Sequence, residues 1–289
     1  MLVLARHVRF CLAILIVAVW LLAQPGLSTG RAVRAAPALQ TIAVVGGQPD
    51  DITVDAHGRL VWGDLAAGTI DRLQGRRIVT IARGLSVPEG VLGLRDGTLL
   101  VAEQGFDRID RIGPGGNRSV IYRLVPAPGQ EGVDGIGRDP RNGDLLVPDS
   151  PRGTLLRMSA YGRHARIIAG GLGRPVDAAT DTHGNVLVPD EHLGTVVAVS
   201  PRGRITYHGA FSTPDDVAVD AGGRAWITTL GDGGLWEMSP GRAPQRILVG
   251  LANPQGLTLD RCGDPIVVEQ NTARIVRVLL SAKATRCAF

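Results

Sequence analysis

Carboxylate side chains recur at equivalent points along this 289-residue chain, at the start of six similar segments. The first residue after each start is, in chain order, Asp50, Glu89, Asp134, Val176, Asp215 and Gln255, and the next is Asp51, Gly90, Gly135, Asp177, Asp216 and Gly256. Carboxylates that a fold brings close together repel each other unless a cation, an arginine or a proton intervenes. Oxygen ligands of this kind suit Ca²⁺ or Mg²⁺, with water or a substrate completing the coordination. The residue types therefore indicate a divalent cation site, provided that the fold gathers the six segments.

The six segments are copies of one pattern, and that pattern predicts the fold. They begin near residues 49, 88, 133, 175, 214 and 254, so the steps between them are 39, 45, 42, 39 and 40 residues. Each copy contains a short apolar run, a turn glycine and a second apolar run. This is the period at which a four-stranded blade repeats. We therefore predict an all-β, six-bladed β-propeller with four-stranded antiparallel blades, formed by residues 37–289.

A second set of carboxylates ends the second apolar run, six residues after the turn glycine. The residues at this position are Asp64, Glu103, Asp149, Asp190, Thr229 and Glu269. Antiparallel strands place them at the same face of the ring as the segment starts. Carboxylates then occupy 12 of the 18 positions at this face. We therefore expect an acidic channel mouth.

A structural role competes with this functional interpretation. Aspartate side chains at loop starts often accept hydrogen bonds from nearby backbone amides, and the repeated acids fit that role. The first position after each start is different because it varies between copies, with Val176 and Gln255 in place of an acid. This variation indicates that the fold of the repeat does not require an acid at the positions of Glu89, Asp134 and Asp215.

The two ends of the domain predict how the ring closes. The first copy supplies four strands, at residues 52–55, 60–64, 69–73 and 77–82. The sixth copy supplies only three strands and ends near residue 280, whereas an additional apolar run at residues 41–45 precedes the first copy. We expect this run to complete the last blade, because closure of the ring removes an exposed edge strand.

Residues 1–36 have the features of a secretory signal peptide or an N-terminal anchor. Arg6 and Arg9 precede a 13-residue apolar run, and small residues follow that run. The run is short for a membrane span, which needs roughly 20 residues. We expect the propeller to lie outside the cytoplasm, as a secreted, periplasmic or cell-surface domain, with membrane attachment only through an uncleaved leader.

The charge balance argues against a nucleic-acid partner. Four of the 31 basic residues and none of the 27 acidic residues lie in the leader, so the remaining chain carries 27 of each sign. Aromatic residues make up only 4% of the chain. A nucleic-acid-binding domain needs a positive surface and, for single strands, aromatic side chains on which bases stack, and neither is indicated here.

Two cysteines follow the leader, Cys262 and Cys287. An even pair of cysteines in an oxidising compartment favours a disulfide. Cys262 falls in the turn of the sixth copy, and Cys287 follows a last strand that leads to the same face. We predict a Cys262–Cys287 disulfide that holds the C-terminal tail beside the closure of the ring.

The repeat pattern, as in PDDITVDAHGRLVWGD from residue 49 and PVDAATDTHGNVLVPD from residue 175, resembles the NHL repeat. It also resembles the six-bladed, calcium-dependent lactonases of the senescence-marker protein and gluconolactonase group, over about residues 41–280. In that group, metal ligands come from the residue just after the repeat start in several blades. The resemblance therefore implies Glu89, Asp134 and Asp215 as ligands of Ca²⁺ or Mg²⁺, with Asp50 as a fourth candidate.

The same resemblance implies a metal-dependent hydrolase that acts on a lactone or ester of a small molecule. The metal would act as a Lewis acid on the substrate carbonyl group. An acid such as Asp149 or Asp190 would be the general base that activates water.

Two other functions stay open. NHL-type propellers often act as non-catalytic scaffolds for a peptide, glycan or protein partner, but the loops of this chain offer few aromatic residues as interface anchors. The metal-dependent streptogramin lyases are also propellers, and they use a histidine with a nearby metal. His192, in the loop PDEHLG, is the histidine placed at the mouth, so it is the candidate catalytic residue for a lyase.

Overall fold

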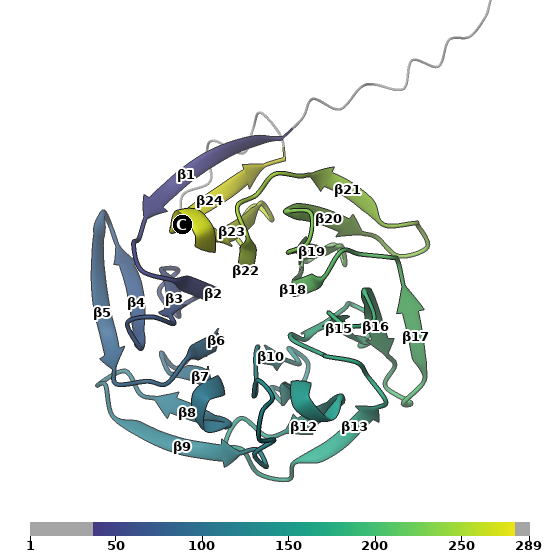
Figure 1. Cartoon of the computed structure of the whole chain (residues 1–289), viewed down its shortest axis with the longest axis horizontal. Coiled ribbons are helices and arrows are strands. Elements are labelled where there is room, and N and C mark those ends of the chain that lie inside the picture. Colours follow the sequence, from purple (N-terminus) through teal and green to yellow (C-terminus); the bar gives the residue numbers. More distant parts are fainter. Residues whose placement is uncertain (1–36, 281–289) are drawn as a thin grey trace, which may run out of the picture. The chain divides into compact units, whose positions relative to one another are not determined.

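The computed structural model describes residues 37–280, which form a closed ring of six four-stranded antiparallel sheets (Figure 1). The predicted six-bladed β-propeller is confirmed. Blade 1 contains β2 (Pro49–Val54), β3 (Leu60–Asp64), β4 (Thr69–Gln74) and β5 (Arg77–Arg83); blade 2 contains β6 (Pro88–Gly93), β7 (Leu99–Glu103), β8 (Arg108–Ile112) and β9 (Arg118–Arg123); blade 3 contains β10 (Gly137–Arg138), β11 (Leu145–Asp149), β12 (Thr154–Met158) and β13 (Arg166–Gly170). Blade 4 contains β14 (Ala179–Thr180), β15 (Val186–Asp190), β16 (Thr195–Val199) and β17 (Ile205–His208); blade 5 contains β18 (Pro214–Val219), β19 (Ala225–Thr229), β20 (Gly234–Met238) and β21 (Gln245–Leu248); blade 6 contains β22 (Pro254–Leu259), β23 (Pro265–Glu269), β24 (Arg274–Leu279) and β1 (Ala38–Val44). Three 3₁₀ helices in this part of the chain follow the second strands of blades 2, 3 and 6: η1 (Gln104–Phe106), η2 (Ser150–Arg152) and η3 (Gln270–Thr272).

The N-terminal strand closes the ring. β1 pairs antiparallel with β24, so the sheet order of blade 6 is β1-β24-β23-β22. Figure 1 shows β1 as the outermost strand of that blade, beside the C-terminal strands. The predicted closure is confirmed, and the strand begins three residues earlier than the expected run at residues 41–45.

The hydrophobic core lies between neighbouring blades. Val61 of blade 1 packs in one cluster with Val101 of blade 2, and Trp226 of blade 5 packs in another with Val267 of blade 6. All four side chains are fully buried. Each blade therefore depends on its neighbours for burial of its apolar faces, which favours a complete ring over separate blades.

Small residues on the inner strands let the blades approach each other near the centre. A Cβ atom on Gly137 would lie 1.7 Å from the carbonyl oxygen of Ala178, and one on Gly90 would lie 2.5 Å from the carbonyl oxygen of Asp134. Larger side chains at these two positions would push adjacent blades apart. The glycines of the repeat therefore set the width of the central channel.

The second acid of the repeat links one blade to the next. Its carboxylate accepts a hydrogen bond from a backbone amide of the following blade, in the pairs Asp51 with Val91 (2.7 Å), Asp177 with Val217 (3.1 Å) and Asp216 with Leu257 (2.5 Å). Glycine takes the same position in the other three blades. These acids therefore serve the fold, as the structural interpretation of the repeat expected.

Several predictions from the sequence lie outside the described residues. These are the leader at residues 1–36 and Cys287, the expected partner of Cys262 in a disulfide. Within residues 37–280, no helix is long and apolar enough to cross a membrane. The cellular location and the disulfide stay predictions.

Candidate functional site

Four carboxylates from four blades meet at one end of the central channel. Asp50 of β2, Glu89 of β6, Asp134 in the loop before β10 and Asp215 of β18 line one cavity of about 20 Å³, and we call these four residues the mouth cluster. The blade-linking acids Asp51, Asp177 and Asp216 line the same cavity. All four side chains are partly buried. The cavity is small, yet about 10–15 Å³ is enough for one water molecule. The structure therefore brings together all four residues proposed as metal ligands.

Irregular pairing at the start of the inner strands aims these side chains. The register between the first and second strands shifts just after Pro49, Pro88 and Pro214. A β-bulge of this kind redirects the side chains of the bulged strand. In blade 1, for example, both Asp50 and Asp51 line the cavity, and Asp51 also accepts a hydrogen bond from the next blade.

The hydrogen bonds of the mouth cluster leave part of its bonding capacity unused. Asp50 Oδ2 accepts a hydrogen bond from Gln270 Nε2 at 2.8 Å, and Glu89 Oε2 accepts one from Gln104 Nε2. The Asp215 carboxylate has no hydrogen-bond or ion-pair partner within residues 37–280. Unpartnered, partly buried carboxylate oxygens are costly, so the cluster favours a cation or protons.

Burial and mutual repulsion disfavour full ionisation of the cluster. Burial raises the pKa of Asp50 from 3.8 to about 8, with the charge of Asp134 adding to the effect. Burial also holds the pKa of Glu89 and of Asp215 well above the usual range, and the nearby charges of Asp134 and Asp50, respectively, raise them further. The pKa of Asp134 is raised by burial as well. A metal-free mouth at neutral pH therefore retains protons.

Arg174 supplies a positive charge at the edge of the cluster. Its Nη2 atom lies 2.8 Å from Asp134 Oδ2, as an ion pair that lacks the angles of a hydrogen bond, and 2.7 Å from Glu131 Oε2. Its Nη1 atom pairs with Glu191. Burial lowers the pKa of Arg174, but the surrounding carboxylates outweigh burial and the pKa is raised overall. Arg174 therefore stays charged and can orient an anionic or polar group at the mouth.

The sequence interpretation missed a further layer of site residues. Gln104, Glu191 and Gln270 each come directly after the acid that ends the second strand of a blade. Two of them donate hydrogen bonds to the mouth cluster, and Glu191 pairs with Arg174. Burial raises the pKa of Glu191. The signal was present in the repeat, because all three residues occupy one equivalent position.

The strand-end acids hold loops in place. Asp190 is fully buried and accepts backbone hydrogen bonds from Gly173 (2.7 Å), Arg174 (2.9 Å) and Leu193 (3.0 Å). The equivalent acids make equivalent contacts, which are Asp64 with Gln48, Glu103 with Ser86 and Glu269 with Ala252. In these four blades, this position of the repeat therefore fixes the loop that enters the blade.

None of the three candidate catalytic residues lines the mouth cavity. Asp190 is engaged by backbone amides as described above. Asp149 is buried and lies 3.3 Å from Arg152, and burial raises its pKa. His192 is exposed. The structure thus gathers the four candidate metal ligands but not the candidate bases, which stay predictions.

The mouth cluster offers oxygen ligands, which are the ligands that a hard divalent cation prefers. All four supply carboxylate oxygens, Asp215 is unpartnered, and Asp134 Oδ2 is buried without a hydrogen bond. Calcium accepts six to eight oxygen ligands, in part from water. Within residues 37–280, however, no group of three or more His, Cys, Asp or Glu side chains is arranged as a ligand set. Binding of a metal would therefore need the side chains to turn inward.

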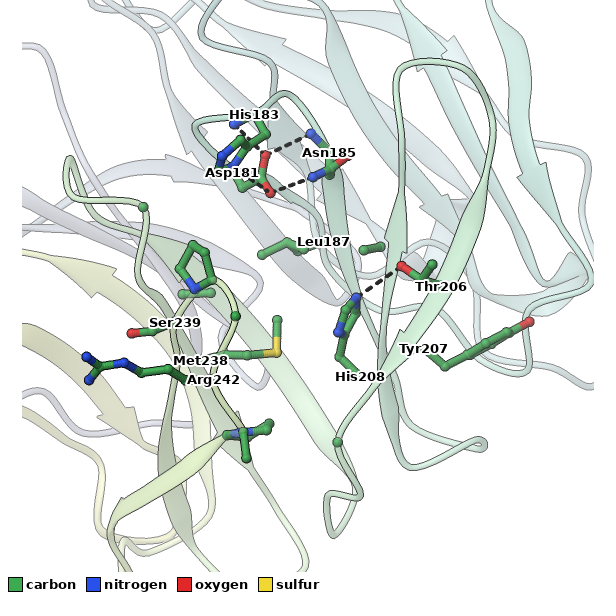
Figure 2. Close-up of a pocket in the computed structure, with 18 of the residues that line it drawn as sticks. Asp181, His183, Asn185, Leu187, Thr206, Tyr207, His208, Met238, Ser239 and Arg242 are labelled. Carbon is green, nitrogen blue, oxygen red and sulfur yellow. Dashed lines mark hydrogen bonds and ion pairs between the residues drawn. The ribbon is translucent and has the colours of Figure 1, made fainter.

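A larger cavity of about 680 Å³ lies between blades 4 and 5, at the opposite end of the strands (Figure 2). Asp181 accepts hydrogen bonds from the backbone amides of His183 and Asn185, both at 2.8 Å, as part of a turn. His208 Nε2 lies 3.0 Å from Thr206 Oγ1. No cluster of carboxylates lines this cavity. The mouth, although smaller, is the better candidate for cation chemistry.

The fold of this chain is similar to that of several propellers of known structure. A gluconolactonase from Xanthomonas campestris matches with a TM-score of 0.72 and 15% identity, covering 85% of this chain and 90% of the other. A virginiamycin B lyase from Staphylococcus aureus matches with a TM-score of 0.66 and 15% identity, covering 85% and 100%. A chain of a nidogen/laminin complex matches with a TM-score of 0.59 and 23% identity, covering 66% and 75%.

The shared feature is the propeller fold. Identities this low do not carry an activity from one protein to another, because propellers host many unrelated functions. Neither a protein-family model nor a curated protein sequence matches the chain. Function therefore has to be argued from the mouth itself.

Proposed function

We propose that this protein is a divalent-cation-dependent hydrolase that opens a lactone or ester of a small molecule at the channel mouth. The observation that carries the proposal is the convergence of four carboxylates, from four blades, on one ion-sized cavity. Their raised pKa values reflect a crowding of negative charge that a bound cation would relieve, with release of the retained protons. The fold shared with a gluconolactonase is consistent with this chemistry.

Glu89, Asp134 and Asp215 would hold the cation, with Asp50 as a fourth ligand. A bound Ca²⁺ or Mg²⁺ would polarise the substrate carbonyl group. Gln104 and Gln270 keep two of these carboxylates oriented through their amide groups.

Glu191, which pairs with Arg174 at the edge of the mouth cluster and whose charge acts on Asp50 and Asp215, is the proposed general base. Burial raises its pKa, and a base with a raised pKa is efficient near neutral pH. It would take a proton from the attacking water while the oxygen of that water bonds to the carbonyl carbon. The single bond between the carbonyl carbon and the ring oxygen of a lactone, or the alkoxy oxygen of an ester, then breaks. The proton passes from Glu191 to that leaving oxygen. Arg174 would orient the substrate and the carboxylate of Glu191.

Calorimetric titration of the purified protein with Ca²⁺ and Mg²⁺ tests the proposal. We expect saturable binding, and Glu89→Gln or Asp134→Asn should each weaken it at least tenfold, or about 1.4 kcal/mol. Asp96→Asn is a matched control, because Asp96 is an exposed acid in the turn at the other end of the inner strand β6. Lactones would then be screened with the metal-loaded protein and with Glu191→Gln.

The second candidate is a non-catalytic binding scaffold. It is favoured by the strand-end acids, whose oxygens are engaged by the fold rather than offered to a substrate. Folded wild-type protein that binds neither Ca²⁺ nor Mg²⁺ would overturn the hydrolase and leave the scaffold.

A further inference from the structure

A basic groove lies between blades 3 and 4, at the end of the strands opposite the mouth cluster. It has a volume of about 600 Å³, and its lining includes Arg141, Arg157, Arg166 and Arg202 but only one acid, Asp139. We call it the seam groove. It is separate from the cavity of Figure 2, although Ser200 lines both.

Two of the four arginines are held in place by Asp139. This carboxylate is fully buried and accepts hydrogen bonds from Arg141 at 2.9 and 2.7 Å and from Arg157 at 2.8 Å. The two guanidinium groups hold the pKa of Asp139 well below its usual range, so the carboxylate stays ionised. Arg141 also donates to the carbonyl oxygen of Gly184, which carries it across the seam to blade 4. These guanidinium groups are therefore positioned before any ligand arrives.

The other two arginines carry unpaired charge. Arg166 and Arg202 are exposed and have no ion-pair partner within residues 37–280. Asp144 lies 3.5 Å from Arg157, just outside the lining. The charge of Asp181 in blade 4 also acts on Arg141, so three acids face the four arginines, and Arg166 and Arg202 are the two left without an ion-pair partner among them.

A pair of arginines without ion-pair partners is not a property of every seam. The groove between blades 1 and 2, of about 350 Å³, is lined by Arg59, Arg72 and Asp55. Arg59 is paired with Asp55 at 2.7 Å there, so a single positive charge is left. The described residues as a whole have 25 arginines against 27 acids. A concentration of arginine at one seam of an otherwise balanced domain needs a specific reason.

We propose that the seam groove binds a small polyanion that carries at least two phosphate or sulfate groups. The planar guanidinium group offers paired donors that match tetrahedral oxyanions and carboxylates. A volume of about 600 Å³ is within the range of small-molecule sites, and a single phosphate would not fill it. The two arginines without ion-pair partners, Arg166 and Arg202, match a ligand with two or more negative charges.

Calorimetric titration of the full-length protein with inorganic pyrophosphate, at low ionic strength in buffer freed of divalent cations by a chelating resin, tests this site. We expect saturable binding at one site, and Arg166→Gln or Arg202→Gln should each weaken it at least fivefold. Arg76→Gln is the matched control, because Arg76 is an exposed arginine in the turn between β4 and β5. Glu89→Gln should bind normally, which separates this site from the proposed metal site at the mouth.

Two results would overturn the proposal. One is binding that does not saturate, and the other is equal weakening by Arg76→Gln and by the groove variants, since either means a diffuse response to charge. Circular dichroism checks that each variant is folded. Cosedimentation with phosphatidylglycerol vesicles, with phosphatidylcholine vesicles as the control, then decides the source of the phosphate. Binding to the anionic vesicles that pyrophosphate displaces indicates a lipid headgroup, and its absence indicates a free solute.

Discussion

In the metal-free protein, the free energy of unfolding is expected to fall by several kcal/mol as the pH rises from about 4 to about 8. The cause is the mouth cluster, where burial raises the pKa of Asp50 from 3.8 to about 8. Between these values the folded protein binds more protons than the unfolded chain, so each rise in pH favours unfolding. Each pH unit contributes about 1.4 kcal/mol per such group. Urea unfolding in EDTA at a series of pH values measures the slope.

Variants and added metal test the origin of this slope. Asp50→Asn removes one of the responsible groups and should flatten it. Asp96→Asn should leave the slope unchanged, because the pKa of Asp96 is lowered and its titration falls below this window. Saturating Ca²⁺ should restore stability at high pH, because a ligand that binds only the folded state stabilises it. A stability that is flat or rises from pH 4 to 8 in EDTA would contradict the proposed crowding of charge.

The fold could be predicted because each level of the sequence agreed with the others. One closed ring was indicated by the repeat steps, by the turn glycines and by the additional apolar run before the first copy. The pairing of β1 with β24 confirms that ring. Repetition also revealed the first acid position, since Val176 and Gln255 interrupt it. The second position varies as well, with glycine in three blades, so only the hydrogen bonds to the next blade identify its acids as serving the fold.

The contacts of the finer layer of the site could not be predicted, because they depend on where loops bring side chains. Arg174 and Glu191 meet across a loop and a strand end, at a distance that no spacing in the sequence gives. Gln104 and Gln270 are uncharged, so the pattern of carboxylates in the sequence does not include them. Conversely, Asp149 and Asp190 look catalytic by residue type, and only their hydrogen bonds reveal that they are engaged elsewhere.

Replacement of Asp190 by alanine is expected to lower the free energy of unfolding by about 3 to 5 kcal/mol. Asp190 is fully buried, and its two oxygens accept three backbone hydrogen bonds, from Gly173, Arg174 and Leu193. A buried donor that loses its partner costs about 1 to 3 kcal/mol. Because Arg174 is one of these donors, the loop that carries the guanidinium group to the mouth would also shift. Urea denaturation measures the loss, with an unchanged m-value as evidence that the folded state is intact.

Asp190→Asn separates this positioning role from catalysis. An asparagine oxygen in the place of Oδ1 still accepts from Arg174 and Leu193, but its amide group faces the amide of Gly173. This variant should therefore lose only about 1 to 2 kcal/mol and should keep the metal affinity of the wild type. A general base behaves in the opposite way, because the amide would abolish turnover and leave stability almost unchanged. Lost turnover in a fully stable Asp190→Asn protein would therefore move Asp190 from the framework of the mouth into its chemistry, and would displace Glu191 as the proposed base.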